Sequence, residues 1–217
     1  MRDQYEHKLE ALNANLIEMG QMCSHAVTRA IQALTELNED AAREVIDQEK
    51  SVNALENAIS QQSILLILKE TPVASDLRFV SAALHMNTDL ERIGDQAEDI
   101  SILVLEMLRR NHAIKEMHSL REMAAVTDHM INQAVQAFIR GDSDLAQETA
   151  LLDDQVDTLF LAVRDELILD IRERTLDAGD MVDLLMIAKY LERIGDHAQN
   201  IAESVLFSLT GKSTKFD

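Results

Sequence analysis

The sequence predicts an all-α protein built as a tandem repeat of two antiparallel three-helix bundles, with six long helices in all. The composition is the first observation: of 217 residues only one is proline, six are glycine and 3% are aromatic, while 47% are apolar. Strands favour β-branched and aromatic residues, and helix interiors avoid proline and glycine. The second observation is the helical spacing of the apolar residues, and the third is that the second half of the chain repeats the first.

Three helices are expected in the first half. Apolar residues recur at steps of three and four over residues 9–37, a spacing typical of a helix with a coiled-coil-like seam. Asn38, followed by two acidic residues, indicates the N-terminus of a second helix. That helix ends before Pro72, because proline disfavours helical backbone in the residue before it. A third helix follows and ends in basic residues at 109–110, the charge that a helix C-terminus favours.

The second half repeats these features in the same order. Matching residues lie 104 positions apart until the second helix–helix connection, after which the pentapeptide at 91–95 (ERIGD) recurs at 192–196, an offset of 101. We therefore predict a first bundle at residues 1–110 and a second at 111–217. The spacing alone leaves open whether these are two separate bundles or one six-helix array.

The charge of the chain excludes several classes of partner. A formal net charge of −19 repels nucleic acid and anionic lipid headgroups, and it suits cations or a basic protein surface. No run of about 20 apolar residues is present, so we expect no direct insertion into a membrane. The single cysteine, Cys23, fits a reducing compartment, and the N-terminal residues do not resemble a secretion signal. The expected location is the cytoplasm.

The repeated pentapeptide carries acidic residues one helical turn apart. Glu91 and Asp95 share one helix face, just outside the apolar seam, and Glu192 and Asp196 repeat the arrangement. The preceding helix of each half carries a similar row, so we predict one acidic groove in each half. The first predicted cluster comprises Glu49, Asn53, Glu91, Asp95 and Asp99, and the second comprises Asp153, Asp157, Glu192, Asp196 and Asn200.

Oxygen ligands of this kind favour hard cations. Gly94 and Gly195 are costly in a helix interior, so their place in the motif suggests the close approach of a neighbouring helix or a ligand. We expect the second cluster to bind metal more tightly, because Asn53 places an amide in the central acidic pair of the first. The alternative reading is a solvated helix face whose acids are paired with lysine or arginine.

Templates for catalysis are missing from the sequence. No histidine completes a Glu-x-x-His pair, and no His-Glu-x-x-His, phosphate-binding loop or Gly-x-Ser-x-Gly motif is present. Cys23 lies in the apolar seam and is expected to be a core residue. We therefore predict no enzyme activity and no catalytic residue. The two other hypotheses are a carboxylate-bridged metalloenzyme on a helical bundle and a metal-free helical scaffold.

The chain resembles the PhoU family of phosphate-signalling regulators. The stretches that carry the resemblance are residues 72–78, 89–100 and 191–201, and it extends over nearly the whole chain. It implies two quasi-symmetric bundles that bind multinuclear clusters of Fe, Mn, Mg or Zn through paired acidic motifs. Asn53 departs from the aspartate that is usual in the family.

The resemblance also implies a function and partners. It implies a cytoplasmic regulator, a homodimer in many family members, that restrains phosphate uptake and phosphate-responsive two-component signalling when phosphate is plentiful. The implied partners are the ATPase subunit of the phosphate importer and the phosphate sensor histidine kinase. Any association with the membrane would be peripheral, through those partners.

Overall fold

The chain folds into long α-helices. The computed structural model describes residues 2–110, 117–173, 176–212 and 216, and among these there is no strand. The predicted all-α tandem fold is confirmed, with one refinement: the fifth predicted helix is divided in two. The elements are α1 (Arg2–Glu36), α2 (Glu39–Glu70), α3 (Ser75–Arg110), α4 (His118–Arg140), α5 (Ser143–Leu151), α6 (Asp153–Glu173) and α7 (Ala178–Thr210).

The first connection of each half is built in the same way. Asn38 caps α2 by accepting a hydrogen bond from the backbone N–H of Ala41 (3.0 Å), and Asp142 caps α5 at the equivalent position. The residue before each cap, Leu37 or Gly141, has left-handed backbone with φ of 55° and 62°. The prediction that the seam of the first helix reaches Leu37 is wrong. The helix ends at Glu36, and the left-handed turn leaves the Leu37 side chain 46% exposed.

The break between α5 and α6 has no counterpart in the first half. Around Leu152 the backbone bonds shorten to i→i−3: Leu152 N–H donates to the Thr149 carbonyl (3.1 Å), and Gln155 N–H donates to the Leu152 carbonyl (3.0 Å). The equivalent position in α2, Gln48, lies inside an unbroken helix. The break directly precedes Asp153, one of the predicted site residues.

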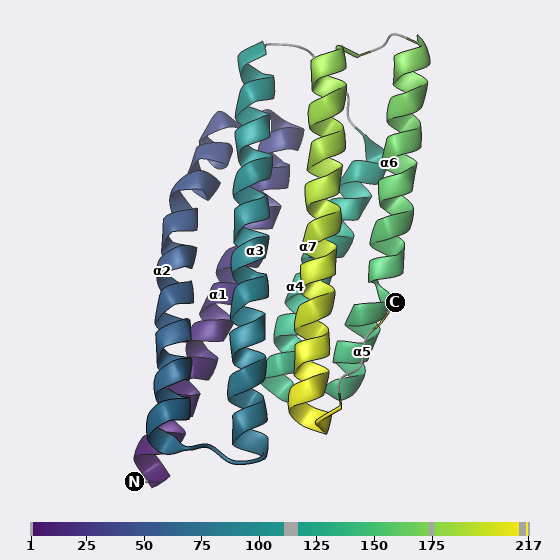
Figure 1. Cartoon of the computed structure of the whole chain (residues 1–217). Coiled ribbons are helices and arrows are strands. Elements are labelled where there is room, and N and C mark those ends of the chain that lie inside the picture. Colours follow the sequence, from purple (N-terminus) through teal and green to yellow (C-terminus); the bar gives the residue numbers. More distant parts are fainter. Residues whose placement is uncertain (1, 111–116, 174–175, 213–215, 217) are drawn as a thin grey trace.

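Two bundles pack side by side into one molecule. The first consists of α1, α2 and α3, and the second of α4, α5, α6 and α7. The most extensive contact between any two helices is that of α3 with α7, which stand next to each other and run in opposite directions (Figure 1). Buried apolar residues from both bundles form one continuous core. The predicted boundary between residues 110 and 111 remains a prediction, since residue 111 lies outside the described residues.

Close contacts tie the bundles together away from the core centre. A Cβ on Gly20 of α1 would lie 2.5 Å from Val135 Cγ2 of α4, so these helices approach closely because Gly20 has no side chain. At the top of Figure 1, Arg110 of α3 forms ion pairs with Asp180 (2.9 Å) and Asp183 of α7. None of the described helices combines the length and the apolar character needed to cross a membrane.

Candidate metal centres

The first acidic cluster lies where α2 and α3 approach each other. Gly94 makes this approach possible, because a Cβ at that position would lie 3.2 Å from Val52 Cγ1 of α2. The expected close approach of a neighbouring helix is confirmed here. The partly buried side chains of Glu49 and Asn53 on α2 face the same region as Glu91 and Asp95 on α3.

Basic and amide groups of the chain already engage this cluster. Arg92 lies 3.3 Å from Glu91 (Nε to Oε2) and 3.1 Å from Asp95 (Nη1 to Oδ2). The amide of Asn53 donates a hydrogen bond to Glu49. The first cluster therefore has counter-charges of its own. This is the arrangement that the alternative interpretation, a solvated helix face with paired acids, predicts.

Burial and mutual repulsion raise carboxyl pKa values in the first cluster. Burial is the main cause of the raised pKa of Glu49 and Glu91, and the charge of Asp95 adds to it in both. Burial is also the main cause of the raised pKa of Glu98, and the charge of Glu49 adds to it. The sequence prediction missed Glu98. Glu98 lies three residues after Asp95, and Asp99 lies four residues after it. Both spacings place a side chain next to Asp95 on the helix surface, but only the spacing of four was used for the prediction.

The second cluster lies between α6 and α7 and contains a buried oxygen without a hydrogen bond. Gly195 again permits the approach, since a Cβ there would lie 3.1 Å from both Asp153 Oδ1 and Val156 Cγ1. Asp153 Oδ1 has no hydrogen-bond partner among the described residues. Burial, followed by the charges of Asp196 and Asp157, raises the Asp153 pKa to about 7. The raised pKa indicates that the carboxylate form lacks sufficient positive charge around it.

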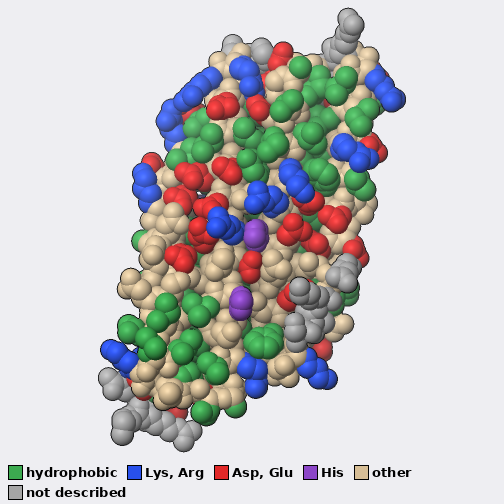
Figure 2. Space-filling view, viewed as in Figure 1, with side chains coloured by type: hydrophobic (Ala, Val, Ile, Leu, Met, Phe, Trp, Pro, Cys, Tyr) green, Lys and Arg blue, Asp and Glu red, His purple; other side chains and the backbone are tan. Residues whose placement is uncertain are grey.

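The remaining acids of the second cluster are more open. Asp157 and Asp196 are exposed, and burial together with the charge of Glu192 raises the pKa of each. Lys189 supplies one counter-charge, because its ammonium group bonds to Glu192 and lies 5.6 Å from the centre of the Phe160 ring. Figure 2, which has the same view as Figure 1, shows acidic and basic side chains gathered across the middle of the visible face.

Asp99 and Asn200, the outermost residues of the predicted clusters, face the opposite bundle. Asn200 donates to Asp89 Oδ1 (3.3 Å), which also lies 2.9 Å from His197 Nδ1. Asp99 lies near Asp95 but also hydrogen-bonds to Tyr190 and is close to Arg193. Asp89 and Tyr190 are themselves equivalent in the repeat. Asp99 and Asn200 therefore join α3 to α7 in a symmetric way. The spacing of residues along one helix does not reveal this role.

The donor atoms of both clusters suit a hard cation. All four inner residues of the second cluster are carboxylates, and the buried Asp153 oxygen without a hydrogen bond is a ready acceptor for positive charge. In the first cluster Asn53 contributes an amide instead. The side chains are not gathered around one point, however: within the described residues, no three His, Cys, Asp or Glu side chains are placed to hold an ion as they stand. An ion would require side-chain movement and displacement of Arg92 or Lys189.

Other reactive residues of the sequence are structural or peripheral. Cys23 is fully buried and donates to the Leu90 carbonyl (3.1 Å), and burial raises its pKa to about 12, so it is a core residue as predicted. His25 and His129 occupy equivalent positions in the two halves. Both are exposed, and His25 lies 3.4 Å from Gln48 Oε1.

Comparison with known proteins identifies the family. The model of the PhoU domain matches the chain twice, at residues 16–104 and 120–205. The chain belongs to the PhoU family. It is 30% identical to PhoU homolog 1 of Thermotoga maritima, over 97% of this chain and 91% of that protein, and 32% identical to the Escherichia coli accessory protein PhoU, over 96% and 86%.

Solved PhoU structures share the fold. The Pseudomonas aeruginosa PhoU structure has a TM-score of 0.92 at 28% identity, over 96% of this chain and all of that one. The phosphate transport system regulatory protein PhoU of Streptococcus pneumoniae has a TM-score of 0.89 at 26% identity, over 98% and 100%. Family members are named as accessory or regulatory proteins of phosphate-specific transport, not as enzymes. The chain is thus a PhoU-family protein of phosphate transport regulation, and the predictions of the family and of a non-enzymatic role are confirmed.

Proposed function

We propose that this PhoU-family chain is a cytoplasmic, metal-binding adaptor that restrains phosphate uptake and phosphate-responsive signalling when phosphate is plentiful. Its proposed partners are the ATPase subunit of the phosphate importer and the phosphate sensor histidine kinase. Support comes from the named relatives, which are accessory and regulatory proteins of phosphate-specific transport.

The observation that carries the metal-binding part is the second acidic cluster. It combines four carboxylates, a buried Asp153 oxygen without a hydrogen bond, and a helix approach that depends on Gly195. Glu192, Asp196, Asp153 and Asp157 would hold the ion, which would supply positive charge between α6 and α7. Because the raised pKa of Asp153 has burial and acidic neighbours as its causes, added positive charge would stabilise the packed form of these helices.

The first cluster would hold metal more weakly. Asn53 cannot bridge two ions with a negative oxygen, and its amide already donates to Glu49. Arg92 pairs with both Glu91 and Asp95 and would compete with an incoming cation. Only part of the charge in this cluster is therefore free to attract a metal.

The adaptor function is tested by recovery of partners from cells grown in high phosphate. Affinity-tagged protein is expected to retain the importer ATPase subunit and the sensor kinase, and deletion of its gene is expected to raise a phosphate-starvation reporter in phosphate-rich medium. Retention of neither partner, together with an unchanged reporter, would contradict the adaptor function.

A metal-free scaffold is the second candidate, and the internal counter-charges favour it. Arg92 and Lys189 already neutralise part of each cluster without any metal. Elemental analysis of untagged protein separates the two candidates. Absence of bound metal, and no thermal shift on addition of Mn²⁺ or iron, would support the scaffold.

A further inference from the structure

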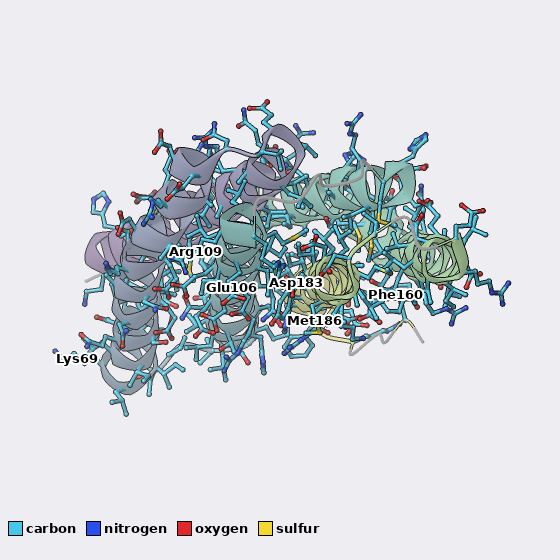
Figure 3. The ribbon with its side chains drawn as sticks, turned by 90° about the horizontal axis from the view of Figure 1, so that it is seen from above. Lys69, Glu106, Arg109, Phe160, Asp183 and Met186 are labelled. Atoms are coloured by element: carbon cyan, nitrogen blue, oxygen red, sulfur yellow. The ribbon has the colours of Figure 1, made fainter. Side chains whose placement is uncertain are left out.

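Exposed apolar side chains gather where α6 ends and α7 begins. We call the set formed by Ile168, Ile171, Val182, Leu185 and Met186 the α6–α7 patch. Each of its side chains is at least 37% exposed, and that of Val182 is 60% exposed. The three α7 residues are spaced i, i+3 and i+4, so they share one helix face. Figure 2 shows hydrophobic side chains over the upper part of the face seen in Figure 1, and Figure 3 labels Met186 on α7 and Phe160 on the neighbouring helix α6.

The internal repeat shows that part of this patch is specific to the second half. Ile168 corresponds to Ile64 of α2, so the α6 part is shared between the halves. Val182 and Met186 correspond to Ser81 and His85, which are polar. Because Val182 and Met186 are solvent-exposed, their apolar character adds little to the core. Exposed apolar groups that form one patch are typical of a contact with another molecule.

The charges beside the patch restrict what covers it. Leu185, Lys189 and Glu192 follow one another at steps of four and three along α7, so the patch continues into the second acidic cluster about 10 Å away. A second copy of this chain carries the same acids beside its own patch, and an anionic membrane is negative as well, so neither supplies positive charge to the acids around Glu192. A partner that pairs an apolar stripe with lysine or arginine complements both parts of the surface.

We propose that the α6–α7 patch is the docking surface for an amphipathic helix of a partner protein. The apolar residues of that helix lie on the patch, and its Lys or Arg residues, two turns further on, reach the acids around Glu192. A helix suits this surface because it presents side chains at i, i+3, i+4 and i+7, the pattern that the face of α7 itself displays. The inference rests on the proposed adaptor function, and it assigns the adaptor's contact surface.

The test replaces the two distinctive residues by their counterparts in the first half. The variant Val182→Ser/Met186→His is compared with wild type and with Leu68→Ser/Val73→Ser, which alters two exposed apolar residues of the first half. Binding of the purified importer ATPase subunit is measured by calorimetry, after circular dichroism has shown equal melting for all three proteins. Wild type and control are expected to bind equally, and the patch variant to bind roughly tenfold more weakly or worse.

Each other outcome is decisive. Equal binding by wild type and the patch variant overturns the docking surface and leaves the adaptor function standing. If wild type binds neither the importer ATPase subunit nor the purified sensor kinase, both the docking surface and the adaptor function are contradicted. A change in sedimentation of the patch variant from dimer to monomer would instead assign the patch to a contact between copies. Binding that does not weaken as NaCl is raised would overturn the basic character of the partner.

Discussion

Leu37 and Gly141 occupy equivalent positions before the first cap of each half, and both have left-handed backbone. A side chain in this conformation costs about 1–2 kcal/mol, whereas glycine adopts it freely. We expect Leu37→Gly to raise the free energy of unfolding by roughly 0.5–1 kcal/mol, after the greater flexibility of glycine in the unfolded chain is taken into account. Urea unfolding measures this.

Leu37→Ala is the matched control for that change. Alanine keeps a Cβ in the left-handed region, and Leu37 is 46% exposed, so little packing is lost. We expect its unfolding free energy to stay within about 0.5 kcal/mol of wild type. A glycine variant no more stable than the alanine variant would show that the backbone at this turn is not strained.

Asp153 gives the metal-free protein a defined dependence on pH. Its pKa is about 7 in the folded protein, against an ordinary value of 3.8, so its carboxyl group favours folding below pH 3.8 and this contribution is lost as pH rises through 7. The raised pKa values of Asp157 and Asp196 act in the same direction. With a chelator present, we expect unfolding free energy to fall between about pH 4 and pH 7 and to fall less in Asp153→Asn.

An exposed acid provides the comparison for Asp153→Asn. The Asp47 side chain is 80% exposed and lies 3.5 Å from Lys50, so Asp47→Asn removes one surface carboxyl group and is the matched control. At pH 8 in chelator, Asp153→Asn is expected to be more stable than wild type. Equal stability of the two at that pH would mean that Asp153 is not destabilised by its acidic neighbours.

At the scale of elements, the contact of α1 with α4 depends on one missing side chain. Alanine favours helix over glycine by about 1 kcal/mol, yet a Cβ on Gly20 would lie 2.5 Å from the stiff side chain of Val135. We expect Gly20→Ala to lower the unfolding free energy by about 1–3 kcal/mol. Thermal and urea unfolding measure this change.

The double variant Gly20→Ala/Val135→Ala tests the cause. Removing the two methyl groups of Val135 relieves the clash, so the second substitution is expected to cost less in the Gly20→Ala background than in wild type. Additive effects of the two substitutions would contradict direct contact between α1 and α4 at this point.

The sequence predicted most elements because their signals are local. Asn38 marks a helix start, Pro72 marks a helix end, and the pentapeptide repeat fixes the equivalence of α3 and α7. The break at Leu152 carries no such signal, since neither proline nor glycine is present there. The break is seen in the backbone hydrogen bonds around Leu152, and the apolar period of the sequence continues through it.

The sequence predicted those residues of the candidate sites whose positions follow from the helices within one bundle. Glu91, Asp95 and their second-half equivalents follow from spacing beside an apolar seam. The placement of Asp99 against Tyr190 depends on the packing of α3 on α7, as does that of Asn200 against Asp89. The sequence did not reveal the contact of α3 with α7, because the apolar seams of the helices are also compatible with two bundles that do not touch.

At the scale of the whole molecule, duplication has produced two acidic clusters of unequal composition. The first contains Asn53 and pairs two of its acids with Arg92. The second has four inner carboxylates and a buried Asp153 oxygen without a hydrogen bond. A hard cation should therefore enter the second cluster first. Asn53→Asp should raise occupancy of the first cluster, and Asp157→Asn should lower that of the second.

The most direct measurement is anomalous scattering from crystals of the wild-type protein titrated with Mn²⁺. We predict that a manganese peak appears first beside Asp153, Asp157, Glu192 and Asp196, and that the first cluster fills only at higher concentration. In Asn53→Asp crystals the first cluster should fill earlier. Equal or reversed occupancy in the wild-type protein would contradict the inequality of the clusters, and no peak at either cluster would contradict metal binding.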